Sequence, residues 1–110
     1  MSSLYAKYIQ EREGKSILEL EHGYATYYYV NEDTVYIEDI FVEKEYRKTG
    51  LGKKLGDLIV KGAKSKGCTQ LLGSVDVRAN GATDSSKFLF SYGMQLHSTN
   101  GNMIYFIKNI

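Results

Sequence analysis

Residues 47 to 67 read RKTGLGKKLGDLIVKGAKSKG, and this stretch decides the fold. Its apolar side chains recur at the spacing of one helix face, while most of the lysines lie off that face. The apolar stripe consists of Leu51, Leu55, Leu58, Ile59 and Ala63. The pattern predicts an amphipathic helix from Gly52 to Lys66, with Gly67 as its C-terminal cap.

The start of this helix has the features of an anion site. A helix N-terminus presents unpaired backbone NH groups and a partial positive charge, so a phosphate binds there with little help from side chains. Gly50 and Gly52 let a ligand approach the backbone closely. The Walker A and dinucleotide-binding glycine patterns are both absent from this loop. A glycine pair that only forms a turn is the alternative interpretation.

The segments on either side alternate between strand and helix patterns. Upstream, the predicted strands form two hairpins, Leu4 to Gln10 with Ser16 to Leu20, and Tyr24 to Val30 with Thr34 to Val42. Downstream we expect a buried strand at Leu71 to Val77, a helix at Asp84 to Tyr92 capped by Thr83 or Asp84, and a hairpin of Met94 to His97 with Met103 to Ile107. The order β-β-β-β-α-β-α-β-β predicts an α/β protein of the α+β kind, with about seven strands in a mixed, mostly antiparallel sheet.

Composition narrows the function classes. The 110 residues are 43% apolar, which is enough for one core, and we expect a single domain over residues 1–110. A net charge of +1 provides no overall field to attract nucleic acid or an anionic membrane. The chain has one cysteine, Cys68, and no apolar run near the roughly 20 residues that cross a bilayer. We expect a cytoplasmic protein, and the separation of His22 from His97 predicts no metal site.

The central motif resembles that of the GNAT superfamily of N-acetyltransferases. That family carries Arg/Gln-x-x-Gly-x-Gly/Ala after a strand, a pattern met here by Arg47, Gly50 and Gly52, with Val42 five residues before the arginine. The resemblance continues through residues 76–80 and through 88–94, where an aromatic helix ends in glycine and an apolar residue. It covers roughly residues 34 to 94.

The resemblance implies acetyl-CoA as co-substrate and a splay between the strand ending at Val42 and the strand Leu71 to Val77. The pantetheine arm would pair with the backbone of Ile40, Phe41 and Val42, and Asn80 would lie beside it. The pyrophosphate would be enclosed by the loop Arg47, Lys48, Thr49, Gly50, Leu51, Gly52 and Lys53. An extended arm can fill such a gap as an additional strand does.

Acetyl transfer also needs a base for the amine and a proton for the leaving thiolate. Glu38 and Asp76 are the carboxylates nearest to the expected splay, and a base acting through water is the alternative. The tyrosine that the family often uses as the acid corresponds here to Leu89. Tyr92, three residues later, is the candidate acid, or else a packing residue.

The acceptor is a primary amine in this interpretation. Between the first two predicted strands, where the family usually inserts helices, only Glu11 to Lys15 is present. We therefore expect an open cleft without acceptor-side helices, suited to a protein lysine or N-terminus. The alternative is a CoA-binding protein without transfer activity that acts through protein contacts. Nucleic-acid binding is the least favoured function, because acidic residues are interleaved with the loop lysines. The sequence does not decide whether two chains pair through their edge strands into a homodimer.

Overall fold

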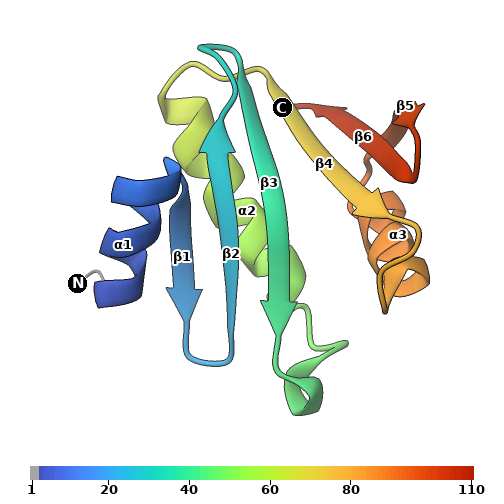
Figure 1. The fold of residues 1–110 in the computed structure, drawn as a ribbon, viewed down its shortest axis with the longest axis horizontal. Coiled ribbons are helices and arrows are strands. Elements are labelled where there is room, and N and C mark those ends of the chain that lie inside the picture. The colour runs from blue at the N-terminus through green and yellow to red at the C-terminus, as the bar shows by residue number, and fades with distance from the viewer. Residues whose placement is uncertain (1–2) are drawn as a thin grey trace.

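The computed structural model describes residues 3–110 and contains one six-stranded sheet with three α-helices (Figure 1). In chain order the elements are α1 Leu4–Glu13, β1 Ser16–Leu20, β2 Gly23–Tyr29, β3 Thr34–Val42, a 3-10 turn at Lys44–Tyr46, α2 Leu51–Ser65, β4 Gln70–Asp76, α3 Ala82–Ser91, β5 Gln95–Asn100 and β6 Met103–Asn109. The helix predicted from the 47 to 67 stretch is confirmed as α2.

The sheet has the strand order β1-β2-β3-β4-β6-β5. Every neighbouring pair is antiparallel except β3 and β4, which run parallel and are joined by the crossover through α2. The predicted mixed, mostly antiparallel sheet is confirmed, with six strands where about seven were expected.

The missing strand is the first one predicted, because Leu4 to Gln10 belongs to helix α1. Ser3 caps this helix by accepting a hydrogen bond from the Ala6 amide at 3.0 Å, and Gly14 ends it in the left-handed conformation. Ala6 and Ile9, three residues apart, are its buried side chains. The strand prediction rested on a turn expected at Glu11 to Lys15, whereas residues 11–13 continue the helix and Gly14 ends it.

Helix α1 also corrects the expectation that the acceptor side carries no helix. Ser3 donates a hydrogen bond to Glu19 of β1, whereas the neighbouring Leu18 and Leu20 pack on the core under α2. Because side chains alternate along a strand, α1 lies on the sheet face opposite α2. Figure 1 shows α1 beside β1 and α2 behind β1, β2 and β3.

The main core lies between the sheet and α2. Leu55 of α2 is fully buried, as are Val35 of β3 and Leu71 of β4, which are paired neighbours in the parallel ladder. Met94 and Phe106 extend this core toward α3. The position of α2 is therefore set by apolar packing along its whole length, which places its N-terminus at a defined point beside the end of β3.

Helix α3 starts two residues earlier than predicted, and neither Thr83 nor Asp84 caps it. Its N-cap is Gly81, in the left-handed conformation, without a side-chain hydrogen bond, and Asp84 lies in the first turn. Leu89 of α3 packs over Gly73 of β4, so α3 covers the second half of the sheet. Within residues 3–110, no helix combines the length and the apolar character needed to span a bilayer.

Candidate functional site

The pairing of strand β3 with its neighbours changes at Glu38. Residues Thr34 to Ile37 pair with β4, and this pairing stops at the couple Ile37 and Gly73. On the other side, β2 pairs Tyr27 with Ile37 and Thr26 with Asp39, so Glu38 is an extra, bulged residue. Beyond it, residues 38–42 keep β2 as a neighbour but have no strand partner on the β4 side among the residues described. The two strands diverge visibly in Figure 1, and the expected splay is confirmed.

The N-terminus of α2 follows the open half of β3. Gly50 is the N-cap, with a φ of 87° and no side-chain hydrogen bond to the helix. The first helical bond runs from the Lys54 amide to the Gly50 carbonyl at 3.0 Å, so the amides of Leu51, Gly52 and Lys53 have no partner within the helix. A side chain built at Gly50 would meet no atom within 4 Å. A ligand phosphate can therefore approach the start of α2 at Gly50.

The loop before α2 is fixed by contacts to β2 and β3. Arg47 Nε donates a hydrogen bond to the Val42 carbonyl at 3.0 Å. The His22 ring stacks on Tyr46 with 3.6 Å between ring centroids, and His22 Nδ1 lies 3.1 Å from Glu43 Oε2. These contacts hold the loop that connects β3 to α2, so they fix the position of the α2 N-terminus relative to the open edge of β3.

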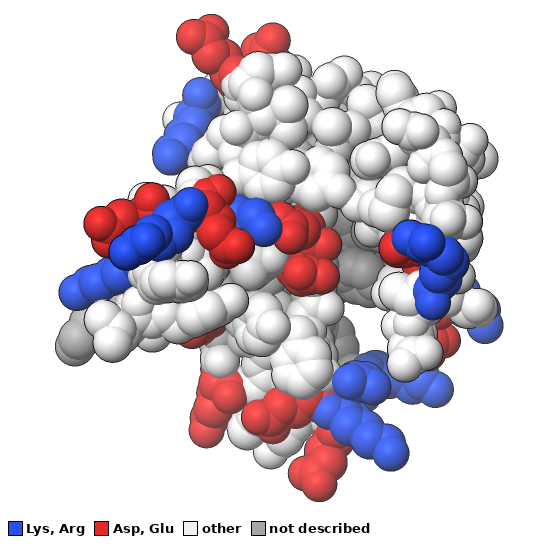
Figure 2. All heavy atoms as spheres, in the orientation of Figure 1, with Lys and Arg blue, Asp and Glu red and all other residues white. Residues whose placement is uncertain are grey.

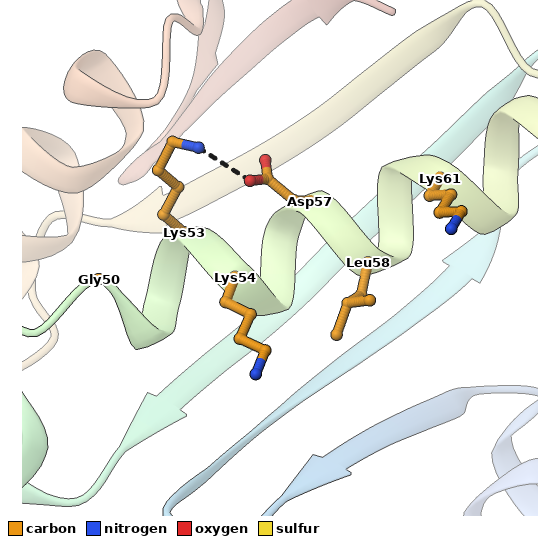
Figure 3. A pocket seen from close by; sticks show the side chains of 6 residues that line it. All are labelled: Gly50, Lys53, Lys54, Asp57, Leu58 and Lys61. Carbon is orange, nitrogen blue, oxygen red and sulfur yellow. Dashed lines mark hydrogen bonds and ion pairs between the residues drawn. The ribbon is translucent and has the colours of Figure 1, made fainter.

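The lysines in the first turns of α2 point in different directions. Lys53 donates to Asp57 at 2.8 Å, on the side of α2 that faces α3, while Lys54 and Leu58 extend the other way (Figure 3). A shallow depression of about 320 Å³ lies along this outer surface of α2, lined by Gly50, Lys53, Lys54, Asp57, Leu58 and Lys61. It touches the loop at Gly50 but lies outside the splay.

Glu38 forms an ion pair that the sequence did not indicate. Lys15, between α1 and β1, donates from Nζ to Glu38 Oε1 at 2.9 Å. The hydrogen bond to Glu38 raises the pKa of the Lys15 ammonium above its usual value of 10.5, partly offset by desolvation. The alternation of side chains along β3 could have indicated the sheet face on which Glu38 lies. It could not have indicated Lys15 as the partner, because 23 residues separate Lys15 from Glu38.

The other two candidate catalytic side chains are held by neighbours. Asp76 accepts hydrogen bonds from the Arg78 side chain and from the Arg78 amide, and these bonds lower the pKa of its carboxyl group. The Tyr92 hydroxyl donates a hydrogen bond to Asp57 Oδ1 at 2.8 Å. Burial, followed by this hydrogen bond to Asp57, raises the pKa of the Tyr92 hydroxyl strongly.

Tyr92 is also confined by packing. Its ring lies against Gly56 of α2, where an added Cβ would come within 3.0 Å of the ring, and Lys108 Nζ sits 4.6 Å from its centroid. The hydroxyl therefore points at α2 through Asp57. Asn80 is exposed in the loop between β4 and α3.

The face opposite α2 carries a group of hydroxyls that the sequence did not single out. Tyr36 of β3 and Ser74 of β4 are hydrogen-bonded to each other, close to where the paired part of the two strands ends. Tyr28 stacks on Tyr36 at 5.1 Å, and burial raises the pKa of the Tyr36 hydroxyl. Charged side chains gather over α1 and the middle of β2 and β3, whereas the surface over β4 and β6 is almost uncharged (Figure 2).

Among residues 3–110, no three His, Cys, Asp or Glu side chains gather closely enough to hold a metal ion. The site thus combines an open strand edge, free helix amides and a bulged carboxylate.

Comparison with known proteins agrees with this arrangement. The model of the acetyltransferase (GNAT) family matches residues 5–91, most of the chain. The chain belongs to the GNAT family.

Solved structures with the GNAT fold superpose on most of the chain. An acetyltransferase from Thermus thermophilus has a TM-score of 0.78 and 12% identity over 94% of this chain and 70% of its own. A GNAT acetyltransferase from Elizabethkingia anophelis, solved with acetyl-CoA bound, has a TM-score of 0.73 and 16% identity over 94% of this chain and 82% of its own. At these identities the likeness shows the fold.

Among curated relatives, the thialysine N-epsilon-acetyltransferase of Sus scrofa is 38% identical over 52 residues, which are 44% of this chain and 31% of that protein. The Bos taurus protein of the same name is 40% identical over 53 residues. The matched region thus spans about a third of the length of these relatives.

Proposed function

We propose that this GNAT-family chain transfers an acetyl group from acetyl-CoA to a primary amine. One observation carries the proposal: the edge of β3 that loses its partner at Glu38 leads directly to the free amides at the N-terminus of α2. An extended ligand with a phosphate at one end matches such a site, because its arm can hydrogen-bond the open edge while the phosphate meets the helix N-terminus.

The residues present fit acetyl-CoA. The backbone of Ile40, Phe41 and Val42 lies on the open edge and would pair with the pantetheine arm. The amides of Leu51, Gly52 and Lys53, together with the open space at Gly50, suit a pyrophosphate. The remaining loop residues, Arg47, Lys48 and Thr49, would enclose it, and Asn80 would approach the arm from the β4 side. The thioester supplies the activated acetyl group.

Glu38 is our first candidate for the base. It is the bulged residue at the apex of the splay, and its 2.9 Å contact with Lys15 demonstrates that an ammonium fits beside it. Asp76 is the second candidate, although the guanidinium of Arg78 lowers its pKa and makes it a weaker base. Tyr92 stays protonated at neutral pH, but its hydroxyl donates a hydrogen bond to Asp57, so acid catalysis from this hydroxyl requires that hydrogen bond to open.

The proposed acceptor is the ε-amine of a lysine-like molecule or side chain. The curated relatives are named for acetylation of a thialysine ε-amine, and the aligned region covers nearly half of this chain. Either a free amino acid or a protein lysine satisfies this chemistry.

The first test is the change in melting temperature on adding acetyl-CoA. Ligand at 100 times its Kd stabilises the folded state by about 2.7 kcal/mol, which raises the Tm of a domain this size by roughly 10 °C. Gly50→Glu should remove the shift, because its carboxylate repels the pyrophosphate. Gly67→Glu is the matched control, since Gly67 also has a positive φ and open space but lies at the other end of α2.

The second test measures release of free CoA thiol with thialysine, lysine and a lysine-containing peptide as acceptors. Faster release with any of them, absent in Gly50→Glu, supports transfer. A clear Tm shift with no release for any amine would instead support a CoA-binding protein without transfer activity. That alternative is favoured by one observation, the packing of Leu89 and Tyr92, which leaves no free tyrosine hydroxyl on α3 or its C-cap.

A further inference from the structure

Lys15 places an amine of the chain itself at the apex of the splay. Its Nζ lies 2.9 Å from Glu38 Oε1, and the two side chains keep only 27% and 33% of their surface exposed. Ion pairs whose side chains remain partly exposed to solvent contribute little to stability. The contact is therefore weak enough to open, and its position rather than its strength is the notable feature.

The apex is also where the reactive end of a bound acyl-CoA has to lie. The open edge of β3 begins next to α2, at Val42, and closes at Ile37, where pairing with β4 resumes. A ligand whose phosphate is at the α2 N-terminus and whose arm follows this edge therefore ends beside Glu38. Lys15 reaches the same carboxylate from the α1 side of the sheet.

We propose that Lys15 is a self-acetylation site, modified within the same chain by acetyl-CoA bound in the splay. The proposal rests on the proposed function, because it uses the same co-substrate and the same carboxylate. It adds a modification site and a consequence: acetylated Lys15 is neutral, so it no longer forms the ion pair and leaves the Glu38 carboxylate open to other amines.

The chemistry balances without another reactant. Lys15 Nζ passes one ammonium proton to Glu38 and from there to solvent. The neutral amine then attacks the thioester carbonyl carbon, so that a carbon–nitrogen bond forms and the carbon–sulfur bond breaks. The second amine proton leaves with the CoA sulfur. The products are Nε-acetyl-Lys15, free CoA thiol and one proton released to water.

Charged neighbours make this reaction slow at neutral pH. Glu38 on β3 holds Lys15 as an ammonium by its hydrogen bond, and Glu13 of α1 and Asp39 of β3 act in the same direction. A simple reactivity scale would therefore rank Lys15 below an exposed lysine such as Lys61. Preferential acetylation of Lys15 would have to come from its position next to the thioester, since proximity is the term that offsets an unfavourable pKa.

The test follows acetylation of each lysine by mass spectrometry after incubation with isotopically labelled acetyl-CoA. We expect Lys15 to be modified about 10-fold faster than Lys61, with a first-order rate that does not change with protein concentration. Gly50→Glu should reduce Lys15 to the background rate and leave Lys61 unchanged. Lys15→Arg keeps a cation beside Glu38 and should remove the fast fraction of incorporated label.

The outcomes separate this proposal from the proposed function. A Tm increase with acetyl-CoA, combined with Lys15 modified no faster than Lys61, overturns self-acetylation and leaves the cofactor site standing. A Lys15 rate that rises in proportion to protein concentration indicates transfer between chains and overturns the intramolecular step. The absence of both the Tm increase and the fast modification overturns the two proposals together.

Discussion

The two halves of β3 belong to one strand but differ in what surrounds them. From Thr34 to Ile37 the strand has neighbours on both edges, and Val35 is fully buried. From Glu38 to Val42 it has β2 alone, and Phe41 is 44% exposed. The first half thus contributes to the core, and the second half offers its backbone to a ligand. A single extra residue, Glu38, separates the two roles.

The comparison shows how a small sheet can hold a binding site without a deep cavity. The open half costs little stability because it is still paired on one edge and because Ile40 and Val42 still pack against the core. The Val42 carbonyl accepts a hydrogen bond from Arg47 Nε, and water can satisfy backbone groups on an open strand edge. Mutations in the two halves should therefore have separable effects on folding and on binding.

The largest effect is expected at the dividing residue. Glu38→Gln should lower kcat by roughly 10²- to 10⁴-fold, the usual contribution of a positioned base, while the affinity for acetyl-CoA stays within a few-fold. Steady-state kinetics with the best amine acceptor would measure this. Asp76→Asn is the comparison variant, and a larger loss there than in Glu38→Gln would assign the base to β4 instead.

Mutations around the paired half of β3 should mainly lower the free energy of unfolding. Leu71→Ala, opposite Val35, should lower the free energy of unfolding by about 2–5 kcal/mol, because it opens a cavity in the core. Phe41→Ala in the open half should cost much less, since its side chain is partly exposed. Urea denaturation of the two variants measures the contrast, and equal losses would contradict the division of β3.

Tyr92→Phe tests whether this residue is an acid or a packing residue. We expect a stability loss of about 1 kcal/mol from the missing hydrogen bond to Asp57 and less than a 10-fold change in kcat. That hydrogen bond, after the one from Lys53, lowers the pKa of Asp57 in the folded state. The stability difference should therefore be present at neutral pH and vanish as the pH falls below about 3.8, the ordinary pKa of an aspartate.

A loss of 100-fold or more in kcat at unchanged stability would identify Tyr92 as the acid. Denaturation at several pH values and steady-state kinetics at neutral pH give the two readings on the same variant.

The smallest effect is predicted beside the bulge. Thr26 pairs with Asp39, is 8% exposed, and has a buried Oγ1 without a hydrogen-bond partner among the side chains described. Thr26→Val should raise the free energy of unfolding by up to about 1 kcal/mol, because it removes an unsatisfied polar atom at nearly constant volume. A loss of stability on thermal denaturation would mean that this hydroxyl has a partner, such as a bound water.

The sequence predicted the elements whose signals are local. The spacing of Leu51, Leu55 and Ile59 predicted α2, and the glycines before it predicted the open helix N-terminus. The prediction was wrong for Leu4 to Gln10, because the residues from Glu11 to Lys15 suggested a hairpin turn, whereas Ser3 and Gly14 cap a helix that continues to Glu13.

The parts of the site that the sequence did not indicate depend on contacts distant in the chain. Neither the pairing of Lys15 with Glu38 nor the bond from Tyr92 to Asp57 has a local signature, since 23 and 35 residues separate the partners. The bulge at Glu38 likewise depends on how β2 and β3 align, which alternation within one strand does not reveal.

Amide hydrogen exchange with and without acetyl-CoA tests most directly whether the open half of β3 and the N-terminus of α2 bind the co-substrate. We predict slower exchange, once acetyl-CoA is added, for the amides of 38–42 that do not bond to β2 and for those of Leu51, Gly52 and Lys53, with no change at Thr34 to Ile37. Unchanged exchange at 38–42 in the presence of saturating acetyl-CoA would mean that the open half of β3 does not bind acetyl-CoA, and the proposed site would be wrong.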